Sequence, residues 1–261
     1  MRIDRREEIL RLLETERAVH AGTLAARFGV SGETVRRDLE GLEREGLLRR
    51  VHGGAVPNTG FSVEPDFDRR ESKNDAEKRA IGRRAAELVE DGDTVFIDVG
   101  TTTLELARAL RGGPAVTVIT GSLLIALTLK DEERARVILL GGQVRGGEGT
   151  TSGHWAEEMA DGFQADKLFL GVGALTAGEG VMDYHIAETN LRRHCIRHAR
   201  QVIALADYSK LGIKALNVIC PAGRLDVLVT DPKADPRQLR ALREQGVEIL
   251  TAHPAPADRL R

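Results

Sequence analysis

Apolar residues first recur at helical spacing and later gather into short runs, so the pattern divides the chain into two parts. Val35, Leu39 and Leu42 are spaced i, i+4 and i+7, which places them on one face of a helix. Ser31 precedes them and can cap that helix, because its hydroxyl can accept a hydrogen bond from a backbone N–H one turn further on. Gly46 follows as a C-terminal glycine. This pattern predicts a helix between Ser31 and Gly46.

Shorter elements flank this helix. Residues 4–15 and 23–28 each carry apolar residues on one helical face, and residues 29–30 form a tight turn. Residues 47–51 read as a basic strand that leads into a glycine turn at 53–54. Two helices, a glycine turn, a third helix and a basic hairpin are the plan of a winged helix-turn-helix. The pattern therefore predicts a small winged helix-turn-helix domain over residues 1–56.

The polar face of the third helix has two interpretations. Glu33, Arg37 and Arg44 point away from the apolar stripe, and an arginine-bearing front suits a helix that lies in a DNA major groove. Any small surface helix also has a polar exterior, and the later glutamates of this one would repel phosphates. The pattern alone leaves both interpretations open.

From residue 76 onward, short apolar strands alternate with helices. The expected strands are residues 94–98, 116–120, 136–140, 167–171, 201–206, 226–230 and 247–250, and helices are expected at 77–88, 103–110, 122–129, 185–199 and 235–245. Such alternation predicts an α/β domain over residues 76–252, with a mostly parallel sheet covered on both faces. Residues 57–75 read as a linker with no assigned element, and residues 253–261 as a C-terminal tail.

Three polar loops follow predicted strands, at residues 99–103, 120–122 and 141–143. Ligands of open α/β sheets bind beyond the carboxyl ends of the strands. The first loop, Gly100 to Thr103, offers a flexible backbone, hydroxyls and the free N–H groups of the next helix, which together can hold a phosphate. A plain helix cap explains the same residues, and the spacing of a Walker loop is absent.

Charged residues near these loops are open to two interpretations as well. Lys210 follows the strand at 201–206 and could reach an anionic ligand, although a solvated loop lysine explains it too. Glu188 opens a helix, where an acidic residue is favourable in any case. His194 and His198 have metal-ligand spacing, but no third ligand is evident, so we expect no metal site.

Composition narrows the class of protein. The chain has 261 residues, a net charge of −2 and 41% hydrophobic residues, which excludes a polybasic nucleic-acid binder. The predicted DNA-binding domain is nearly balanced in charge, so DNA binding must depend on the placement of a few arginines, doubled by a partner subunit. Two cysteines and the lack of a signal peptide or a membrane span indicate a cytoplasmic protein.

The segments VSGETVRRDL and GLLRRVHGGA resemble the signature of the DeoR family of bacterial transcriptional regulators, and the resemblance continues over nearly all of the chain. It implies a C-terminal sensor domain related in fold to ribose-5-phosphate isomerase, which binds phosphorylated sugars or related metabolites. It also implies a homo-oligomer, operator DNA as a partner and no cofactor.

The resemblance assigns roles to individual residues. The predicted DNA-binding residues are Ser31, Thr34, Arg36, Arg37, Arg49 and His52. Thr34 and Arg37 are expected at base edges, and Ser31, Arg36 and Arg49 at phosphates. The predicted ligand-binding residues are Asp98, Gly100, Thr101, Thr102, Thr103, Thr120, Gly141, Gly142, Glu188, Asp207 and Lys210. Gly121 departs from the family, which often has asparagine there.

Three functions remain to be compared. The leading hypothesis is a sequence-specific DNA-binding regulator, usually a repressor in this family, that controls carbohydrate metabolism in response to a phosphorylated sugar. The alternative is a sugar-phosphate isomerase with an accessory domain, in which carboxylates such as Asp98 would move protons. A third hypothesis is a C-terminal domain that only oligomerises.

Overall fold

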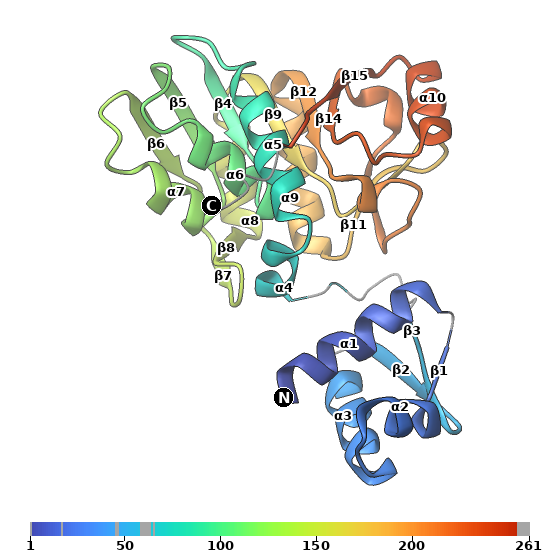
Figure 1. Ribbon diagram of the computed structural model, residues 1–261. Coiled ribbons are helices and arrows are strands. Elements are labelled where there is room, and N and C mark those ends of the chain that lie inside the picture. The colour runs from blue at the N-terminus through green and yellow to red at the C-terminus, as the bar shows by residue number, and fades with distance from the viewer. Residues whose placement is uncertain (1, 17, 45–46, 58–63, 65, 255–261) are drawn as a thin grey trace, which may run out of the picture. The chain divides into compact units, whose positions relative to one another are not determined.

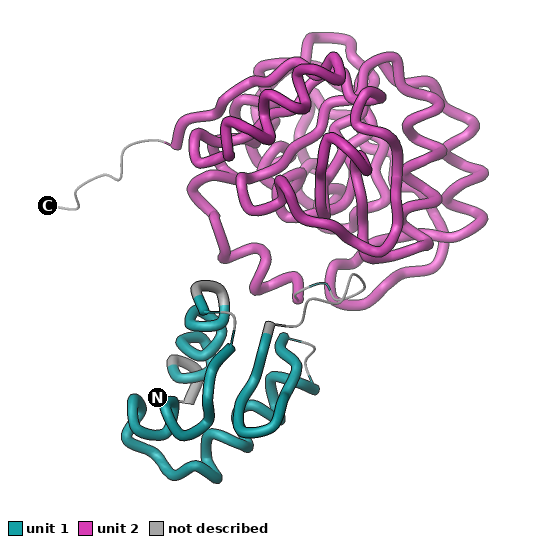
Figure 2. Tube along the Cα trace, turned by 90° about the vertical axis from the view of Figure 1, so that its right-hand side faces the viewer, with its two compact units in different colours: residues 1–65 teal, residues 66–261 magenta. Residues whose placement is uncertain are grey.

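The computed structural model describes residues 2–16, 18–44, 47–57, 64 and 66–254. The chain divides into two compact units, shown in different colours in Figure 2. The N-terminal unit is Met1–Pro65 and the C-terminal unit is Asp66–Arg261. Each unit is described by itself.

The N-terminal unit is a winged helix-turn-helix. Its elements are α1 (Arg2–Thr15), β1 (Val19–His20), α2 (Ala21–Phe28), α3 (Gly32–Arg44), β2 (Leu48–Val51) and β3 (Gly54–Pro57). The strands form an antiparallel sheet in the order β1-β3-β2. The predicted helices and the hairpin are confirmed, whereas β1 was not predicted, because two residues are too few to show alternation. Gly46, the predicted end of the third helix, lies outside the described residues.

Apolar residues from all three helices and the wing build the core of this unit. Fully or nearly fully buried are Ile9, Leu13, Leu24, Val35, Leu39, Leu42 and Leu48. Asp38 of α3 is buried with them, at 3% exposure, and accepts a hydrogen bond from Arg5 Nε of α1 at 2.6 Å. The pair satisfies a charge that would otherwise be costly to bury, and it fixes α1 against α3.

The C-terminal unit is built on one seven-stranded sheet. Its strands are β4 (Thr94–Ile97), β5 (Val116–Thr120), β6 (Ala135–Leu139), β9 (Ala165–Gly171), β12 (Ala199–Leu205), β14 (Val227–Thr230) and β15 (Glu248–Thr251). The order is β15-β14-β12-β9-β4-β5-β6, and every neighbouring pair is parallel. Each predicted apolar run lies in one of these strands, so the predicted α/β class is confirmed.

Helices cover both faces of this sheet (Figure 1). One face packs against α5 (Asp75–Ala86), α6 (Thr101–Ala109) and α7 (Leu123–Leu129). The other packs against α8 (His154–Asp161), α9 (Ile186–Arg197) and α10 (Pro236–Glu244). The side chains alternate accordingly, since Val95 and Ile97 belong to the first core and Phe96 to the second.

Several short elements were not predicted. Residues 57–75, to which the sequence assigned no element, contain the helix α4 (Phe67–Ser72). The others are the hairpin β7 (Gln143–Arg145) and β8 (Thr150–Ser152), the strands β10 (Ala174–Thr176), β11 (Gly180–Asp183) and β13 (Asn217–Cys220), the helix α8, and the 3₁₀ turns η1 (Tyr208–Lys210) and η2 (Ala222–Arg224). Most are three or four residues long, so neither helical nor strand periodicity can develop.

The strand order reverses at β4. From β4 the chain adds β5 and β6 on one side, and then returns to add β9 and the later strands on the other side. The carboxyl ends of β4 and β9 therefore flank the topological switch point, which is where open α/β sheets bind ligands.

Candidate functional site

The first turn of α3 holds two of the predicted DNA-binding residues. Ser31 Oγ accepts a hydrogen bond from the backbone N–H of Thr34 at 3.2 Å, which confirms the predicted cap. The two hydroxyl oxygens lie 2.9 Å apart. Ser31 is exposed and Thr34 is half-buried, so Thr34 presents only part of its side chain at the surface.

Arg36 and Arg37 lie on the exposed side of α3. Their side chains are 70% and 76% exposed. Glu33 is between them, with its carboxylate oxygens 3.6 Å from Arg36 Nη1 and 3.8 Å from Arg37 Nε. Both distances exceed those of a hydrogen bond, so the two guanidinium groups keep their donors for another acceptor.

The two arginines of the wing have different surroundings. Arg50 Nη1 lies 2.5 Å from Glu40 and its Nε lies 3.2 Å from Glu43, so two glutamates of α3 are neutralised within the protein. Their predicted repulsion of phosphates is reduced accordingly. Arg49 and His52 are exposed, and Arg49 has no ion-pair partner in the part of the chain that the structure describes.

An open groove of about 690 Å³ runs between α3 and the wing. Its lining includes Arg36, Glu40, Arg50, His52 and Gly54. Gly54 is required there for packing, because a Cβ atom on it would lie 2.0 Å from the carbonyl oxygen of Val19. Of the predicted DNA-binding residues, Arg36 and His52 therefore line this groove.

In the C-terminal unit, Asp98 lies at the switch point. It follows β4, is 9% exposed, and its Oδ2 accepts hydrogen bonds from Gly171 N at 2.9 Å and from Arg192 Nε at 2.7 Å. Gly171 ends β9, and a Cβ on it would lie 2.5 Å from the carbonyl oxygen of Val99. Burial raises the pKa of Asp98 to about 6, against the charge of Arg192.

Sequence analysis missed Arg192, which is at the centre of the charged residues around Asp98. Its Nη1 lies 2.7 Å from Asp183 Oδ2, and its Nη2 lies 3.7 Å from Glu188 Oε2. Glu188 also pairs with Arg145 Nε of the β7–β8 hairpin, at 2.7 Å. The i, i+4 spacing of Glu188 and Arg192 was the available signal in the sequence.

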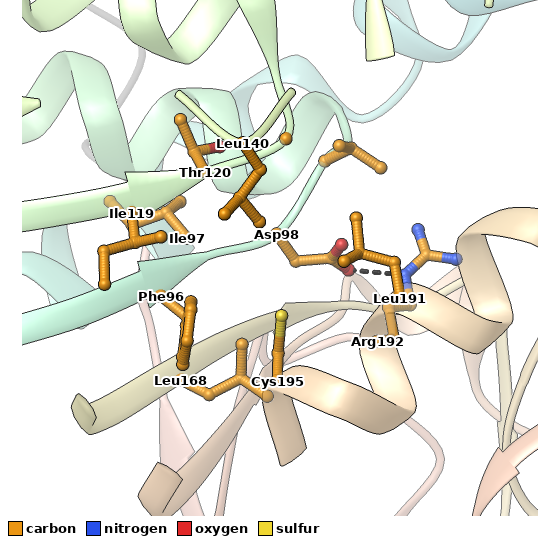
Figure 3. A pocket seen from close by; sticks show the side chains of 12 residues that line it. Phe96, Ile97, Asp98, Ile119, Thr120, Leu140, Leu168, Leu191, Arg192 and Cys195 are labelled. Carbon is orange, nitrogen blue, oxygen red and sulfur yellow. Dashed lines mark hydrogen bonds and ion pairs between the residues drawn. The ribbon is translucent and has the colours of Figure 1, made fainter. Parts of the chain in front are cut away.

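A small enclosed cavity adjoins this group (Figure 3). Asp98, Thr120 and Arg192 line it together with apolar side chains and Cys195. Burial raises the pKa of the Cys195 thiol, so the cysteine stays protonated and acts as an apolar side chain. Most of the cavity wall is therefore apolar.

The predicted phosphate loop begins α6. Gly100 has φ 137°, a conformation that favours glycine, and precedes the first helical residue. Thr103 is fully buried and donates its hydroxyl to the carbonyl oxygen of Gly100 at 3.0 Å, so it acts as a structural residue. Thr101 is nearly buried, Thr102 is half-buried, and the first N–H groups of the helix have no acceptor within it.

Asp207 and Lys210 belong to a second group, at the end of β12. Asp207 Oδ1 accepts hydrogen bonds from Asn74 Nδ2 at 2.9 Å and from Ser209 Oγ at 2.6 Å, so that oxygen holds its own turn together. Lys78 of α5, a second basic residue, lies close enough to Lys210 for their charges to interact. Burial lowers the pKa of Lys78 to about 8.

The remaining predicted ligand residues serve backbone packing. Thr120 is buried, and its Oγ1 accepts a hydrogen bond from Ser122 N at 3.1 Å. A Cβ on Gly142 would lie 2.5 Å from the carbonyl oxygen of Ser152, and Gly141 N lies 3.2 Å from Met159 Sδ. These two glycines allow the β7–β8 hairpin and α8 to approach the sheet.

Gly121, the departure from the family pattern, is covered by the same hairpin. A Cβ there would lie 3.1 Å from the carbonyl oxygen of Thr151 and 3.3 Å from Leu191 Cδ2. Thr151 N donates to the carbonyl oxygen of Gly121 at 2.7 Å. An asparagine side chain would require the hairpin to move.

The described residues offer neither a metal site nor a membrane-spanning helix. No three His, Cys, Asp or Glu side chains among the described residues are grouped to hold a metal ion. His194 Nδ1 and His198 Nε2 both lie at Asp161 Oδ1, at 2.7 and 3.0 Å. None of the helices in residues 2–254, as far as these are described, is long and apolar enough to cross a membrane.

A winged helix-turn-helix joined to an α/β unit with a charged crevice is typical of a ligand-responsive transcription regulator. The model of the DeoR-like helix-turn-helix domain matches residues 5–60, and that of the DeoR C terminal sensor domain matches residues 73–232. The chain therefore belongs to the DeoR family and is a DNA-binding transcriptional regulator, which decides against the isomerase alternative.

Relatives match over almost their whole length. The HTH-type transcriptional regulator GolR of Listeria innocua is 33% identical, over 95% of this chain and 98% of that protein. The glycerol-3-phosphate regulon repressor of Escherichia coli is 29% identical, over 94% of this chain and 97% of that protein. The solved structure of ribose-5-phosphate isomerase A from Methanocaldococcus jannaschii aligns with 54% of this chain and 55% of that chain, at 19% identity. The TM-score of 0.39 is too low to establish a shared fold.

Proposed function

We propose that this protein is a repressor of carbohydrate metabolism whose operator affinity changes when a phosphorylated sugar binds the C-terminal unit. The observation that carries the proposal is the buried Asp98, whose carboxylate accepts a hydrogen bond from Gly171 N at the switch point of the large sheet. The same chain also contains a winged helix-turn-helix. The name of the Escherichia coli relative, a glycerol-3-phosphate regulon repressor, supports a phosphorylated metabolite.

The N-terminal unit supplies the operator contacts in this proposal. Arg37 and the exposed part of Thr34 reach base edges in the major groove. Ser31, Arg36, Arg49 and His52 contact the sugar–phosphate backbone. A homo-oligomer presents two such surfaces to one operator, which compensates for the near-zero net charge of a single N-terminal unit.

The phosphoryl group is assigned to the start of α6, with Lys78 and Lys210 as nearby cations. Free helix N–H groups favour an anion, and Thr101 and Thr102 add hydroxyl donors. The lowered pKa of Lys78 supports this assignment, because a cation held in a desolvated position gains most from an anionic partner. Asp98 and Glu188 accept hydrogen bonds from sugar hydroxyls at the other end.

The same lysine offers a route for the response. Lys78 Nζ donates to the carbonyl oxygen of Arg70, and to that of Glu71 at 2.8 Å, which are residues of α4. A phosphate that binds Lys78 competes with these carbonyls and so changes the anchoring of α4. Because α4 is the first element of the C-terminal unit and follows the N-terminal unit in the chain, the two ligand states can differ in DNA affinity.

Thermal unfolding with a panel of sugar phosphates tests the ligand assignment. A ligand that binds the native state raises the unfolding temperature by mass action, so one or a few compounds should stabilise the wild-type protein. Thr101→Val should reduce that shift, because it removes one hydroxyl donor from the phosphate site while keeping its shape. If Thr101→Val shows the same shift in unfolding temperature as the wild type, the loop does not bind the phosphate. If no sugar phosphate shifts the unfolding temperature of the wild type, the effector is not of this class.

A further inference from the structure

We propose that Glu33 reads the operator directly, by accepting a hydrogen bond from the N4 amino group of a cytosine next to the base pair that Arg37 contacts. The inference rests on the DNA-binding function and adds a residue that determines its specificity. Glu33 is the second residue of α3 and is 63% exposed. Residues at the start of a recognition helix are those that reach base edges.

Glu33, Glu40 and Glu43 of α3 all have arginine ion-pair partners, but Glu33 differs in the distance to its partners. Glu40 and Glu43 have Arg50 of the wing as a partner, at 2.5 and 3.2 Å. Glu33 lies 3.6 and 3.8 Å from Arg36 and Arg37, so neither of its oxygens accepts a hydrogen bond from them. Its carboxylate keeps its full capacity to accept hydrogen bonds on the face that meets DNA.

A carboxylate on this face must find a donor when DNA binds. The major groove is flanked by phosphates, and a desolvated carboxylate without a donor is unfavourable there. The amino group of cytosine is the base-edge donor that acidic side chains pair with, and arginine pairs with O6 and N7 of guanine. Glu33 and Arg37 are one helical turn apart, so they can serve neighbouring base pairs.

Two simpler roles make different predictions. An acidic residue in the first turn is favourable for the helix itself, and in that role its removal lowers stability without changing sequence preference. A glutamate that only repels phosphates would, when removed, strengthen binding to every sequence alike. Base reading alone changes the preference at one position of each half-site.

Selection of binding sites from random duplexes tests the proposal on the full-length protein. The wild type should select sites with one invariant C·G pair per half-site that Glu33→Ala no longer requires, with a loss of about tenfold or more in discrimination at that pair. Glu33→Gln should shift that position toward A·T, because the amide pairs with adenine. The matched control is Glu7→Gln, which removes the same charge from an exposed position of α1, outside the groove lined by Arg36 and Arg50, and should keep the wild-type consensus.

Three results would overturn the proposal. They are an unchanged consensus in Glu33→Ala, a uniform rise in affinity for all sequences, and an equal shift of preference in Glu7→Gln. If the wild type itself selects no sequence, the DNA-binding function fails, and this result is distinct from an unchanged consensus in the variant. Far-ultraviolet circular dichroism of each variant verifies that α3 is folded.

Discussion

At the scale of single residues, the clearest feature of the C-terminal unit is a carboxylate held where its charge is disfavoured. Asp98 is buried beside Arg192, and Asp183 adds a second negative charge nearby. Arg192 keeps Asp183 and Glu188 as partners whether or not Asp98 is ionised. Burial is the physical reason for the raised pKa of Asp98, and the charge of Arg192 opposes it only in part. Asp98 can take up a proton without leaving Arg192 unpaired.

The raised pKa predicts how stability depends on pH. In the folded chain Asp98 binds a proton near pH 6, and in the unfolded chain only near its ordinary value of 3.8. The folded state therefore binds more protons between these values, and the contribution of Asp98 to stability increases as the pH falls from 7 to 5. Urea unfolding of the wild type should gain about 1 kcal/mol relative to Asp98→Asn over that interval. An equal pH dependence of the two proteins would contradict the raised pKa.

Arg37 gives a prediction for the N-terminal unit. Its side chain is 76% exposed on α3, so Arg37→Ala should leave the fold intact, weaken operator binding by about 1–3 kcal/mol and relax the preference at one base pair. Arg44→Ala removes the same charge from the last turn of α3 and is the matched control. Fluorescence anisotropy with the operator and its single-base variants measures both effects. Wild-type affinity in Arg37→Ala would exclude the base contact.

Among the helices and strands, those with a repeating apolar pattern could be predicted from the sequence, and short strands without such a pattern could not. The seven strands of the large sheet and the three helices of the N-terminal unit have clear apolar periods. The hairpin β7–β8 and the strand β1 have none, because each strand is only two or three residues long. The pairing of β1 also joins distant residues, such as Val19 and Ala55. Local pattern carries no information on such pairing.

Some residues of the candidate site could likewise be predicted from the sequence, and others could not. Asp98 and Glu188 could be found because they directly follow a strand or begin a helix. For Arg192 the sequence offered only its i, i+4 spacing from Glu188, and only the fold brings it to Asp98 at 2.7 Å. Thr103 and Asp207 have the expected residue types but use hydrogen bonds within their own turns.

The contact between α1 and α3 predicts a cost for removing one buried charge. Asp38→Ala leaves Arg5 without its carboxylate, so the N-terminal unit should lose about 1–3 kcal/mol of unfolding free energy. Arg11→Ala breaks an exposed pair on the same helix and should have little effect. Denaturant unfolding followed by circular dichroism compares them. Equal stability of the two variants would show that the buried pair does not hold α1 against α3.

At the scale of the whole molecule, the protein combines a DNA-binding unit of nearly balanced charge with a unit that carries a charged ligand crevice. Affinity for DNA then depends on a few arginines, and binding should weaken as salt rises because phosphate contacts release counterions. Control by a ligand requires that it bind the DNA-competent and the DNA-free states unequally.

We propose that the protein binds a specific operator and that a phosphorylated sugar changes its affinity for that operator. The most direct measurement is fluorescence anisotropy of labelled DNA from the region upstream of the protein's own gene, titrated with protein and then with sugar phosphates. We expect salt-sensitive binding that exceeds binding to random DNA and that one sugar phosphate alters at least several-fold. Specific binding that no sugar phosphate alters would contradict the claim that the crevice around Asp98 controls the DNA-binding unit.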